Sequence, residues 1–358
     1  MAHRVHVDIT KLHALNQGRG VGMYTELLVR SMKKYVEEHD MNWEIEIIDR
    51  PTKQRPEIVH YPYFDLFFST LPLQLPTQSQ KTVVTIHDVI PLVYPKFYKP
   101  GLRGCLVHLW QKAKLSRVDA ILTDSDASRK DIHALLKLPY PKIHRVYLAG
   151  HPEIRTQPQS MISEVIKKYS LPKQYILYIG DINYNKNLPR LIEAYAKLNA
   201  PPALVLLGRS VKNTSIPEGR AIAEAVRKYK VQDRVVLLDS VPKEPITDIA
   251  AILSGAELYV QPSLYEGFGL PVLDAFQTNT IVCSSTGGSL SEVAGKAAVT
   301  FSPTQVSQIV RAMNRALSFS SADRMLYQRM MKDQIARFSW NKAAEETLRV
   351  YASLVRGR

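Results

Sequence analysis

The most informative stretch of the sequence is Ser263-Leu-Tyr-Glu-Gly-Phe-Gly-Leu-Pro-Val-Leu-Asp274. It follows an apolar run over 257–261 that is typical of a buried strand. Pro271 stands where a helix can begin, because the missing N–H of proline has no intrahelical partner there. Gly267 and Gly269 permit turns and a close approach to a ligand that a Cβ would prevent. The stretch predicts a strand, a glycine loop and a helix N-terminus, where a phosphate can bind.

Two carboxylates flank this predicted phosphate site. Glu266 comes before the helix, and we expect Asp274 in its first turn. Both would then lie at the mouth of the same pocket. The alternative is an ordinary strand–helix turn, in which Asp274 only interacts favourably with the positive end of the helix dipole. These residues alone leave both interpretations open.

Length and composition indicate a two-domain globular protein. The chain has 358 residues, which is long for a single core. Its two cysteines, Cys105 and Cys283, fall in separate halves, and this favours free thiols in a reducing compartment. We expect no signal peptide, because strand-like residues follow directly on the first four, and no run is long and apolar enough to span a membrane. A cytoplasmic protein is therefore expected.

The net charge of +14 is most informative in one segment, residues 89–118, which contains no acidic residue. Its basic residues are Lys96, Lys99, Arg103, Lys112, Lys114 and Arg117, interleaved with Tyr94, Phe97, Tyr98 and Trp110. A basic amphipathic segment of this kind can lie on an anionic membrane surface. A merely solvated helix face is the plain alternative, and a nucleic acid would be a third partner for such a patch. Among partners we expect the membrane surface and no nucleic acid.

Strand-like and helical patterns alternate along both halves, which predicts mostly parallel, doubly wound sheets. Residues 149–160 lack periodicity and are interpreted as the linker, so the expected domains are 1–160 and 161–337, with a last helix after 338. The expected strands are 4–9, 43–48, 57–61, 82–87, 119–123 and 144–147 in the first half, and 175–179, 203–207, 234–238, 257–260, 281–284 and 297–301 in the second.

The opening of the chain partly resembles a dinucleotide-binding unit. Residues 18–22 read Gly-Arg-Gly-Val-Gly, but a long loop separates them from the first strand. Met23 also stands where the G-x-G-x-x-G fingerprint needs its third glycine. The fingerprint is therefore absent, although Gly20 and Gly22 can still cradle a phosphate at a helix N-terminus.

Further candidates follow the ends of predicted strands, where ligands bind in parallel sheets. His87 ends the strand at 82–87 and could donate a hydrogen bond or shield a developing charge. Lys186 and Arg209 follow two strands of the same predicted sheet as Glu266, so they are candidate diphosphate ligands. Asp124-Ser-Asp126 matches a D-x-D metal pattern, but it also matches a helix N-cap, and we expect no metal there.

With these positions in hand, the chain resembles the retaining glycosyltransferases of family four, the "group 1" glycosyl transferases with the GT-B fold. The resemblance runs nearly from end to end, and the stretch at 263–274 is its most specific part. The motifs that carry it are Gly20–Tyr24, Thr85–Asp88, Thr123–Ser128, Gly180–Asn187, Ser263–Asp274 and Phe338–Trp340. It implies two doubly wound Rossmann-like domains facing a central cleft, with the last helix crossing back to the first domain.

The resemblance also implies roles for single residues. His87 would lie beside the reacting sugar and Glu266 would face its ring. Asp274 would bind the ribose hydroxyls of the donor. The remaining donor-binding residues would be Gly20, Gly22, Lys186 and Arg209 at the diphosphate, the backbone amides of Phe268, Gly269 and Leu270 at the sugar or phosphate, and the loop at Ser240-Val241 at the base.

Three positions depart from the family pattern. Asp274 replaces the usual second Glu and is shorter by one methylene, so ribose contact would need a shifted helix or a bridging water. Asn185 stands where the family usually has Arg, which removes one cation from the phosphate site. Asp181 adds a negative charge beside that loop, and the sequence offers no explanation for it.

The sequence thus predicts a retaining, metal-independent hexosyltransferase of polysaccharide biosynthesis that needs no cofactor. The resemblance favours a GDP sugar such as GDP-mannose as donor, with a UDP sugar close behind. The acceptor would be a glycan or a lipid-linked glycan, and a lipid-linked one would place the protein peripherally at the inner face of the cell membrane through 89–118. The alternatives are a nucleotide-sugar epimerase of the same fold and a catalytically silent nucleotide-binding subunit.

Overall fold

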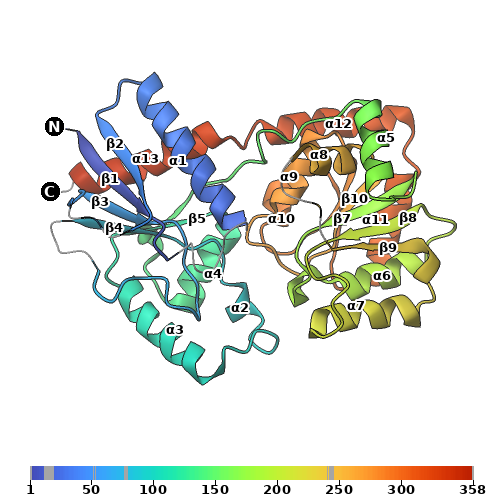
Figure 1. The fold of residues 1–358 in the computed structure, drawn as a ribbon, viewed down its shortest axis with the longest axis horizontal. Coiled ribbons are helices and arrows are strands. Elements are labelled where there is room, and N and C mark those ends of the chain that lie inside the picture. Colours follow the sequence, from blue (N-terminus) through green and yellow to red (C-terminus); the bar gives the residue numbers. More distant parts are fainter. Residues whose placement is uncertain are drawn as a thin grey trace. The chain divides into compact units, whose positions relative to one another are not determined.

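The computed structural model describes residues 2–11, 20–50, 52, 54–75, 80–239, 241 and 246–356 (Figure 1). It divides into two compact units, which are described separately. Unit 1 comprises Met1–Leu148 and Phe338–Arg358, and unit 2 comprises Ala149–Arg337. No helix among the described residues is both long and apolar enough to cross a membrane.

Unit 1 is built on a six-stranded parallel sheet with the order β2-β1-β3-β4-β5-β6. The strands β3 and β5 are buried at every position, as expected for the inner strands of a parallel sheet with helices on both faces. The strands are β1 (His3–Asp8), β2 (Trp43–Ile48), β3 (Ile58–Tyr61), β4 (Lys81–Thr85), β5 (Ala120–Thr123) and β6 (Ile143–Arg145).

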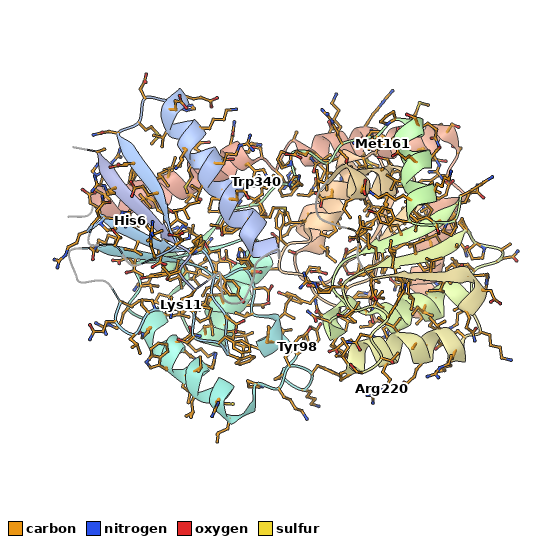
Figure 2. All side chains as sticks on the ribbon, viewed as in Figure 1. His6, Lys11, Tyr98, Met161, Arg220 and Trp340 are labelled. Atoms are coloured by element: carbon orange, nitrogen blue, oxygen red, sulfur yellow. The ribbon has the colours of Figure 1, made fainter. Side chains whose placement is uncertain are left out.

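The helices of unit 1 lie on two sides of this sheet (Figure 1). They are α1 (Gly20–Glu38), α2 (Ile90–Val93), α3 (Gly101–Leu115), α4 (Asp126–Leu136) and α13 (Trp340–Arg356), with a 3-10 turn at Tyr140–Lys142. The C-terminal helix α13 belongs to unit 1 although unit 2 precedes it in the sequence, so the prediction of a returning last helix is confirmed. It packs against α1, and Trp340 lies at its start, 6.4 Å from Tyr24 between ring centroids (Figure 2).

Unit 2 holds a second six-stranded parallel sheet, with the order β12-β11-β10-β7-β8-β9. Counted from its own first strand, this is the doubly wound order 3-2-1-4-5-6, whose switch point lies between β7 and β10. The strands are β7 (Tyr175–Ile179), β8 (Ala203–Leu207), β9 (Val235–Leu238), β10 (Leu258–Gln261), β11 (Val282–Ser285) and β12 (Val299–Phe301). The predicted doubly wound, parallel architecture of both domains is confirmed.

The helices of unit 2 form two groups of packed neighbours. One group is α6 (Leu188–Ala196), α7 (Pro217–Lys228) and α11 (Val306–Leu317). The other is α5 (Gln159–Lys168), α8 (Ile246–Ser254), α9 (Leu270–Gln277) and α12 (Ser321–Ile335). The short helix α10 (Leu290–Ala294) packs on α9, and 3-10 turns lie at Tyr184–Lys186 and Gln232–Arg234.

The first boundary between the units lies between Leu148 and Ala149, earlier than the boundary after residue 160 that the sequence indicated. Hydrogen bonds explain the difference. The backbone N–H of His151 donates to Asp274 Oδ1 over 2.9 Å, and Gln277 Nε2 donates to the carbonyl of Ile154 over 3.2 Å. The irregular segment that resembled a linker is therefore fastened to α9 and belongs to unit 2.

A buried chain of polar side chains ties α13 to the centre of the first sheet. Tyr351 and His60 Nδ1 are 2.7 Å apart, and His60 Nε2 lies 2.7 Å from the hydroxyl of Thr85. Tyr24 of α1 reaches the same hydroxyl over 3.1 Å. Burial, with the nearby charge of His87, lowers the pKa of His60 to about 3, so its ring is neutral and one nitrogen accepts while the other donates.

Replacing Tyr351 with Phe should destabilise unit 1 by about 1–3 kcal/mol, because a buried nitrogen of His60 loses its partner. All three tryptophans, Trp43, Trp110 and Trp340, lie in unit 1, so tryptophan fluorescence during urea unfolding reports on that unit alone. Tyr140→Phe is the matched control, since the Tyr140 side chain is exposed. Equal midpoints for the two variants would show that the buried chain contributes nothing.

Candidate functional site

The candidate site lies at the carboxyl ends of β7 and β10, at the switch point of the second sheet. The segment after β7 carries Lys186 in a 3-10 turn, and the segment after β10 carries Glu266. Three hydrogen bonds hold these segments together. Leu264 N donates to Asn185 O over 2.7 Å, Asn185 Nδ2 to Tyr265 O over 2.9 Å, and Asn187 Nδ2 to Pro262 O over 2.9 Å.

This arrangement gives Asn185 a structural explanation. The sequence marked it only as a missing cation, because the family usually has Arg there. In the structure the side chain is 3% exposed and its amide joins the two segments that carry Lys186 and Glu266. An exposed guanidinium at this position would add a cation but would not make this buried hydrogen bond. Asn185 lacks the charge and instead links the two segments at the switch point.

The Glu266 carboxylate is the most highly coordinated group of the site. It accepts from Lys186 Nζ over 2.7 Å and 2.8 Å, one bond to each oxygen. It also accepts from Gln261 Nε2 over 2.9 Å and from the Ser263 hydroxyl over 2.6 Å. The structure thus brings two predicted site residues together as an ion pair, in which Lys186, expected at a diphosphate, binds Glu266.

Gln261 and Ser263 are site residues that the sequence did not single out. Both are buried and both donate to Glu266. The available signal was a polar side chain at the end of an otherwise apolar strand, Leu258–Gln261, at the sheet edge where ligands bind. Because three donors surround the carboxylate, its negative charge is stabilised and its oxygens are fixed in position.

The glycine loop begins α9 as predicted. Gly269 is the residue before the helix and has φ of 104°, a left-handed conformation that favours glycine. Leu270 is the first helical residue, and the ring of Phe268 is 5% exposed. The hydroxyl of Ser289 donates to the carbonyls of both Glu266 and Phe268, over 3.0 Å and 2.7 Å. The loop is therefore held rigidly beneath the N-terminus of α9.

Asp274 lies in the second turn of α9, so its expected place in the first turn is wrong. The helix begins at Leu270, and the positive end of its dipole acts mainly on the first turn. Its carboxylate instead accepts from the backbone of His151. Burial raises the pKa of Asp274 to about 7, although the bond from His151 lowers it. The ribose contact stays a prediction.

The other predicted residues of unit 2 lie at neighbouring strand ends. Arg209 follows β8 and is exposed, directly after the buried Gly208. A Cβ on Gly208 would lie 2.2 Å from the carbonyl oxygen of Gly180, so the segments after β8 and β7 approach closely. Val241 is buried after β9, while its neighbour Ser240 lies outside the described residues.

In unit 1 His87 follows β4 and is paired with Asp124, which follows β5. His87 Nδ1 lies 2.8 Å from Asp124 Oδ2, and the Tyr24 ring meets the imidazole edge-on at 4.6 Å. Burial alone would lower the pKa of His87, but the charge and hydrogen bond of Asp124, with smaller contributions from Asp88 and the Pro62 carbonyl, leave it raised. Asp124 is therefore a partner of His87 that the sequence did not identify.

The structure supports the helix N-cap interpretation of Asp124-Ser-Asp126. Ser125 is the N-cap of α4 and its side chain accepts from Ser128 N over 3.0 Å. Asp124 binds His87, and Asp126 is the first helical residue. Within the described ranges, His, Cys, Asp and Glu side chains form no group of three that could hold a metal ion.

Gly20 and Gly22 lie inside the first turn of α1, because that helix begins at Gly20. The sequence indicated a loop that ends at Gly22, whereas residues 20–22 are helical in the structure. Residues 12–19 lie outside the described residues. A Cβ on Gly20 would meet no atom within 4 Å. Both glycines remain at a helix N-terminus, and their role at a diphosphate stays a prediction.

Residues 162–333 match the family model "Glycosyl transferases group 1". The chain is 29% identical to the O-antigen chain mannosyltransferase B of Escherichia coli over 82% of this chain and 75% of the relative. It is 27% identical to the serotype-specific mannosyltransferase WbdA of Escherichia coli over 84% of this chain, but it spans only 37% of that protein. The structure of Anabaena HepE in complex with UDP and glucose superposes with a TM-score of 0.72 at 12% identity, covering 99% and 100% of the two chains.

The two doubly wound units define a GT-B fold. Residues 162–333 of the second unit carry a glycosyl transferases group 1 domain, and the chain is similar to glycosyltransferases over most of its length. The resemblance found in the sequence is thereby confirmed.

The Asp124→Asn variant should lower the pKa of His87, because it removes the negative charge that favours the imidazolium. In the wild-type protein this raised pKa stabilises unit 1 fully below about pH 6.5, and the contribution is lost as pH rises through the folded-state pKa. NMR titration of the His87 ring, assigned with His87→Gln, measures the shift. An unchanged pKa in Asp124→Asn would show that the pair carries no charge interaction.

The Asp274→Asn variant tests the raised pKa of the Asp274 carboxyl on α9. Its raised pKa stabilises unit 2 fully below about pH 4, and this contribution is lost as pH rises through about 7. Asn keeps an oxygen for His151 and has no charge, so its stability relative to wild type should rise between about pH 4 and about pH 7. Urea unfolding followed by circular dichroism measures this, with the exposed Asp333→Asn on α12 as control. If the stability of the variant and of the wild type changed with pH in parallel, the pKa of Asp274 would not be raised in the folded protein.

Proposed function

We propose that the chain is a retaining glycosyltransferase that moves a hexose from a nucleoside-diphosphate sugar to a glycan acceptor. The observation that carries the proposal is the geometry at the switch point of unit 2. There a lysine, a buried glutamate and the N-terminus of α9 meet at neighbouring strand ends. Switch points of doubly wound sheets bind nucleotides, and helix N-termini bind phosphates.

Mannose is the sugar that we propose as first choice, with GDP-mannose as donor. Two relatives are named mannosyltransferases, and both align with most of this chain. HepE, a structural neighbour, was solved with UDP and glucose, and it supports a UDP sugar as the second choice. Arg209 and the loop at Val241 would contact the diphosphate and the base of the donor. A lipid-linked glycan is the proposed acceptor, because the first relative is named for O-antigen chains.

In the proposed mechanism the donor diphosphate competes with Glu266 for Lys186. The ammonium that now binds both carboxylate oxygens would turn to a phosphate oxygen, with Arg209 and the amides of α9 as further donors. Glu266 would keep its bonds from Gln261 and Ser263 and face the sugar ring as an anion. Its charge would favour an oxocarbenium-like transition state on the donor face.

Because these cations and amides can neutralise the leaving diphosphate, we propose that transfer needs no metal ion. Retention of configuration would follow from departure of the diphosphate and attack by the acceptor on the same face of the sugar. The role that the family resemblance implies for His87, beside the reacting sugar, is part of the proposal. Asp124 raises the pKa of His87, which favours the positively charged ring.

The Lys186→Ala variant should lower kcat/KM about 100-fold or more, since it removes a donor that stabilises the leaving group. It should also destabilise unit 2, because Glu266 loses its counterion in a site where that carboxylate is 9% exposed. The double variant Lys186→Ala/Glu266→Gln should recover stability and stay inactive. Lys197→Ala, whose ion pair with Glu193 is on the surface, is the matched control.

The assay begins with thermal shifts in GDP, UDP and ADP, and continues with product analysis using the matching sugar nucleotide, with and without EDTA. NMR of the product gives its anomeric configuration. Unchanged turnover in Lys186→Ala would remove Lys186 from the mechanism, and unchanged donor affinity in Asp274→Ala would remove Asp274 from the ribose. Conversion of a UDP sugar without acceptor would indicate the epimerase, and binding without turnover the silent subunit.

A further inference from the structure

The helix α3 of unit 1 presents an apolar stripe to solvent. Leu102, Leu106 and Leu109 follow one another at helical spacing, and they are 80%, 61% and 64% exposed. Ala113 continues the same line and is also exposed. Single exposed leucines are ordinary on protein surfaces, but a continuous row of them marks an interaction site.

The opposite face of α3 is fixed to its own unit. Gln111 is fully buried, donates to the carbonyls of Asp65 and Phe68 over 2.7 Å and 2.9 Å, and accepts from Thr70 N over 2.8 Å. Lys114 donates to the carbonyls of Pro72 and Leu73. The helix is therefore anchored through Gln111, Lys114 and the buried Leu115, while Leu102, Leu106 and Leu109 are held outward.

Only some of the basic and aromatic residues that the sequence indicated in 89–118 are exposed in the structure. Lys114 is buried, lies over the ring of Trp110 at 3.5 Å and donates to two backbone carbonyls, so it does not serve an outer surface as the sequence indicated. Trp110 is half-buried. Tyr94 and Tyr98 are half-buried. The exposed apolar side chains are leucines together with Phe97, which is 52% exposed.

Cations flank the leucines on both sides. By helical spacing Arg103 lies to one side of the stripe and Lys112 to the other, and Lys96 and Lys99 precede the helix as exposed residues. No acidic residue occurs between residues 89 and 118. Asp119, the next acid along the chain, is paired with Lys81 over 3.0 Å. The segment that carries the stripe therefore has positive charge along its edges and no acidic residue of its own.

We propose that this α3 surface, defined as Phe97, Lys99, Leu102, Arg103, Leu106 and Leu109, docks on an anionic lipid bilayer. The leucines would enter the boundary between headgroups and acyl chains, and the cations would bind lipid phosphates. Charge complementarity selects this occupant. A second copy of the chain would bring two basic surfaces together, and a nucleic acid backbone offers nothing to a row of leucines. The proposal does not depend on the proposed transfer activity.

Vesicle co-sedimentation of the full chain tests the proposal, with phosphatidylcholine alone or mixed with phosphatidylglycerol. The wild-type protein should bind the anionic vesicles, and less so as salt is raised. Leu106→Gln/Leu109→Gln should lower the partition coefficient about tenfold or more. Lys99→Gln/Arg103→Gln should lower it on anionic vesicles only. The matched controls are Met325→Gln/Leu326→Gln on α12, at 55% and 54% exposure, and Arg30→Gln/Lys33→Gln on α1.

A native thiol gives a second readout at the surface itself. Cys105 is exposed beside Leu106, whereas Cys283 is buried, so an environment-sensitive dye attaches to Cys105 alone. Its emission should shift to the blue on anionic vesicles, with the same concentration dependence as sedimentation. Tryptophan fluorescence unfolding shows that each variant of unit 1 is folded.

Three outcomes would overturn the proposal. The first is equal binding to neutral and anionic vesicles, and the second is unchanged binding by the folded leucine variant. The third is a wild-type dimer that dissociates in the leucine variant without any vesicle binding, which would assign the surface to a second copy. The vesicle and dye measurements need no donor or acceptor, so their failure is distinguishable from failure of the proposed transferase activity.

Discussion

The buried pair of Lys186 and Glu266 is the interaction on which the candidate site depends. A carboxylate that is 9% exposed is costly without a counterion, because the protein interior replaces the solvation of water only where opposite charges and hydrogen bonds are supplied. The pair exists because β7 and β10 are neighbours, although 80 residues separate the two side chains. Asn185 then fixes the register of the two segments, and the glycine loop starts α9 directly after Glu266.

Much of the fold follows from local patterns in the sequence. Continuous apolar runs such as Ala203–Leu207 appear as strands at the predicted positions, and their alternation with helices gives parallel sheets. The order of the strands is a matter of long-range pairing, which periodicity does not encode. The sequence therefore named Lys186 and Glu266 as site residues but could not show them in contact, since that requires knowing that β7 lies beside β10.

What the sequence missed at the site has the same physical origin. Neighbouring residues correctly indicated a helix N-cap at Asp124-Ser-Asp126, but they did not show that the partner of Asp124 is His87, 37 positions away. The segment after Leu148 was interpreted as a linker from its missing periodicity, but the carboxylate that fastens it belongs to Asp274. Hydrogen bonds between irregular segments leave no repeating pattern in sequence. They decide both where unit 2 begins and in which direction the pKa of His87 is shifted.

The charged residues also show the difference between what composition gives and what only the structure determines. The net excess of +14 is a property of the whole chain, yet the function of each cation depends on which acid it meets. Lys81, Lys168 and Lys186 are each within 3.0 Å of a carboxylate, so they add little to the outer field of the protein. The cations beside α3 have no acid within their own segment and stand next to exposed leucines. Positive charge therefore has two roles. At the switch point of unit 2 it holds a carboxylate in place, and beside α3 exposed cations are available to an external anion.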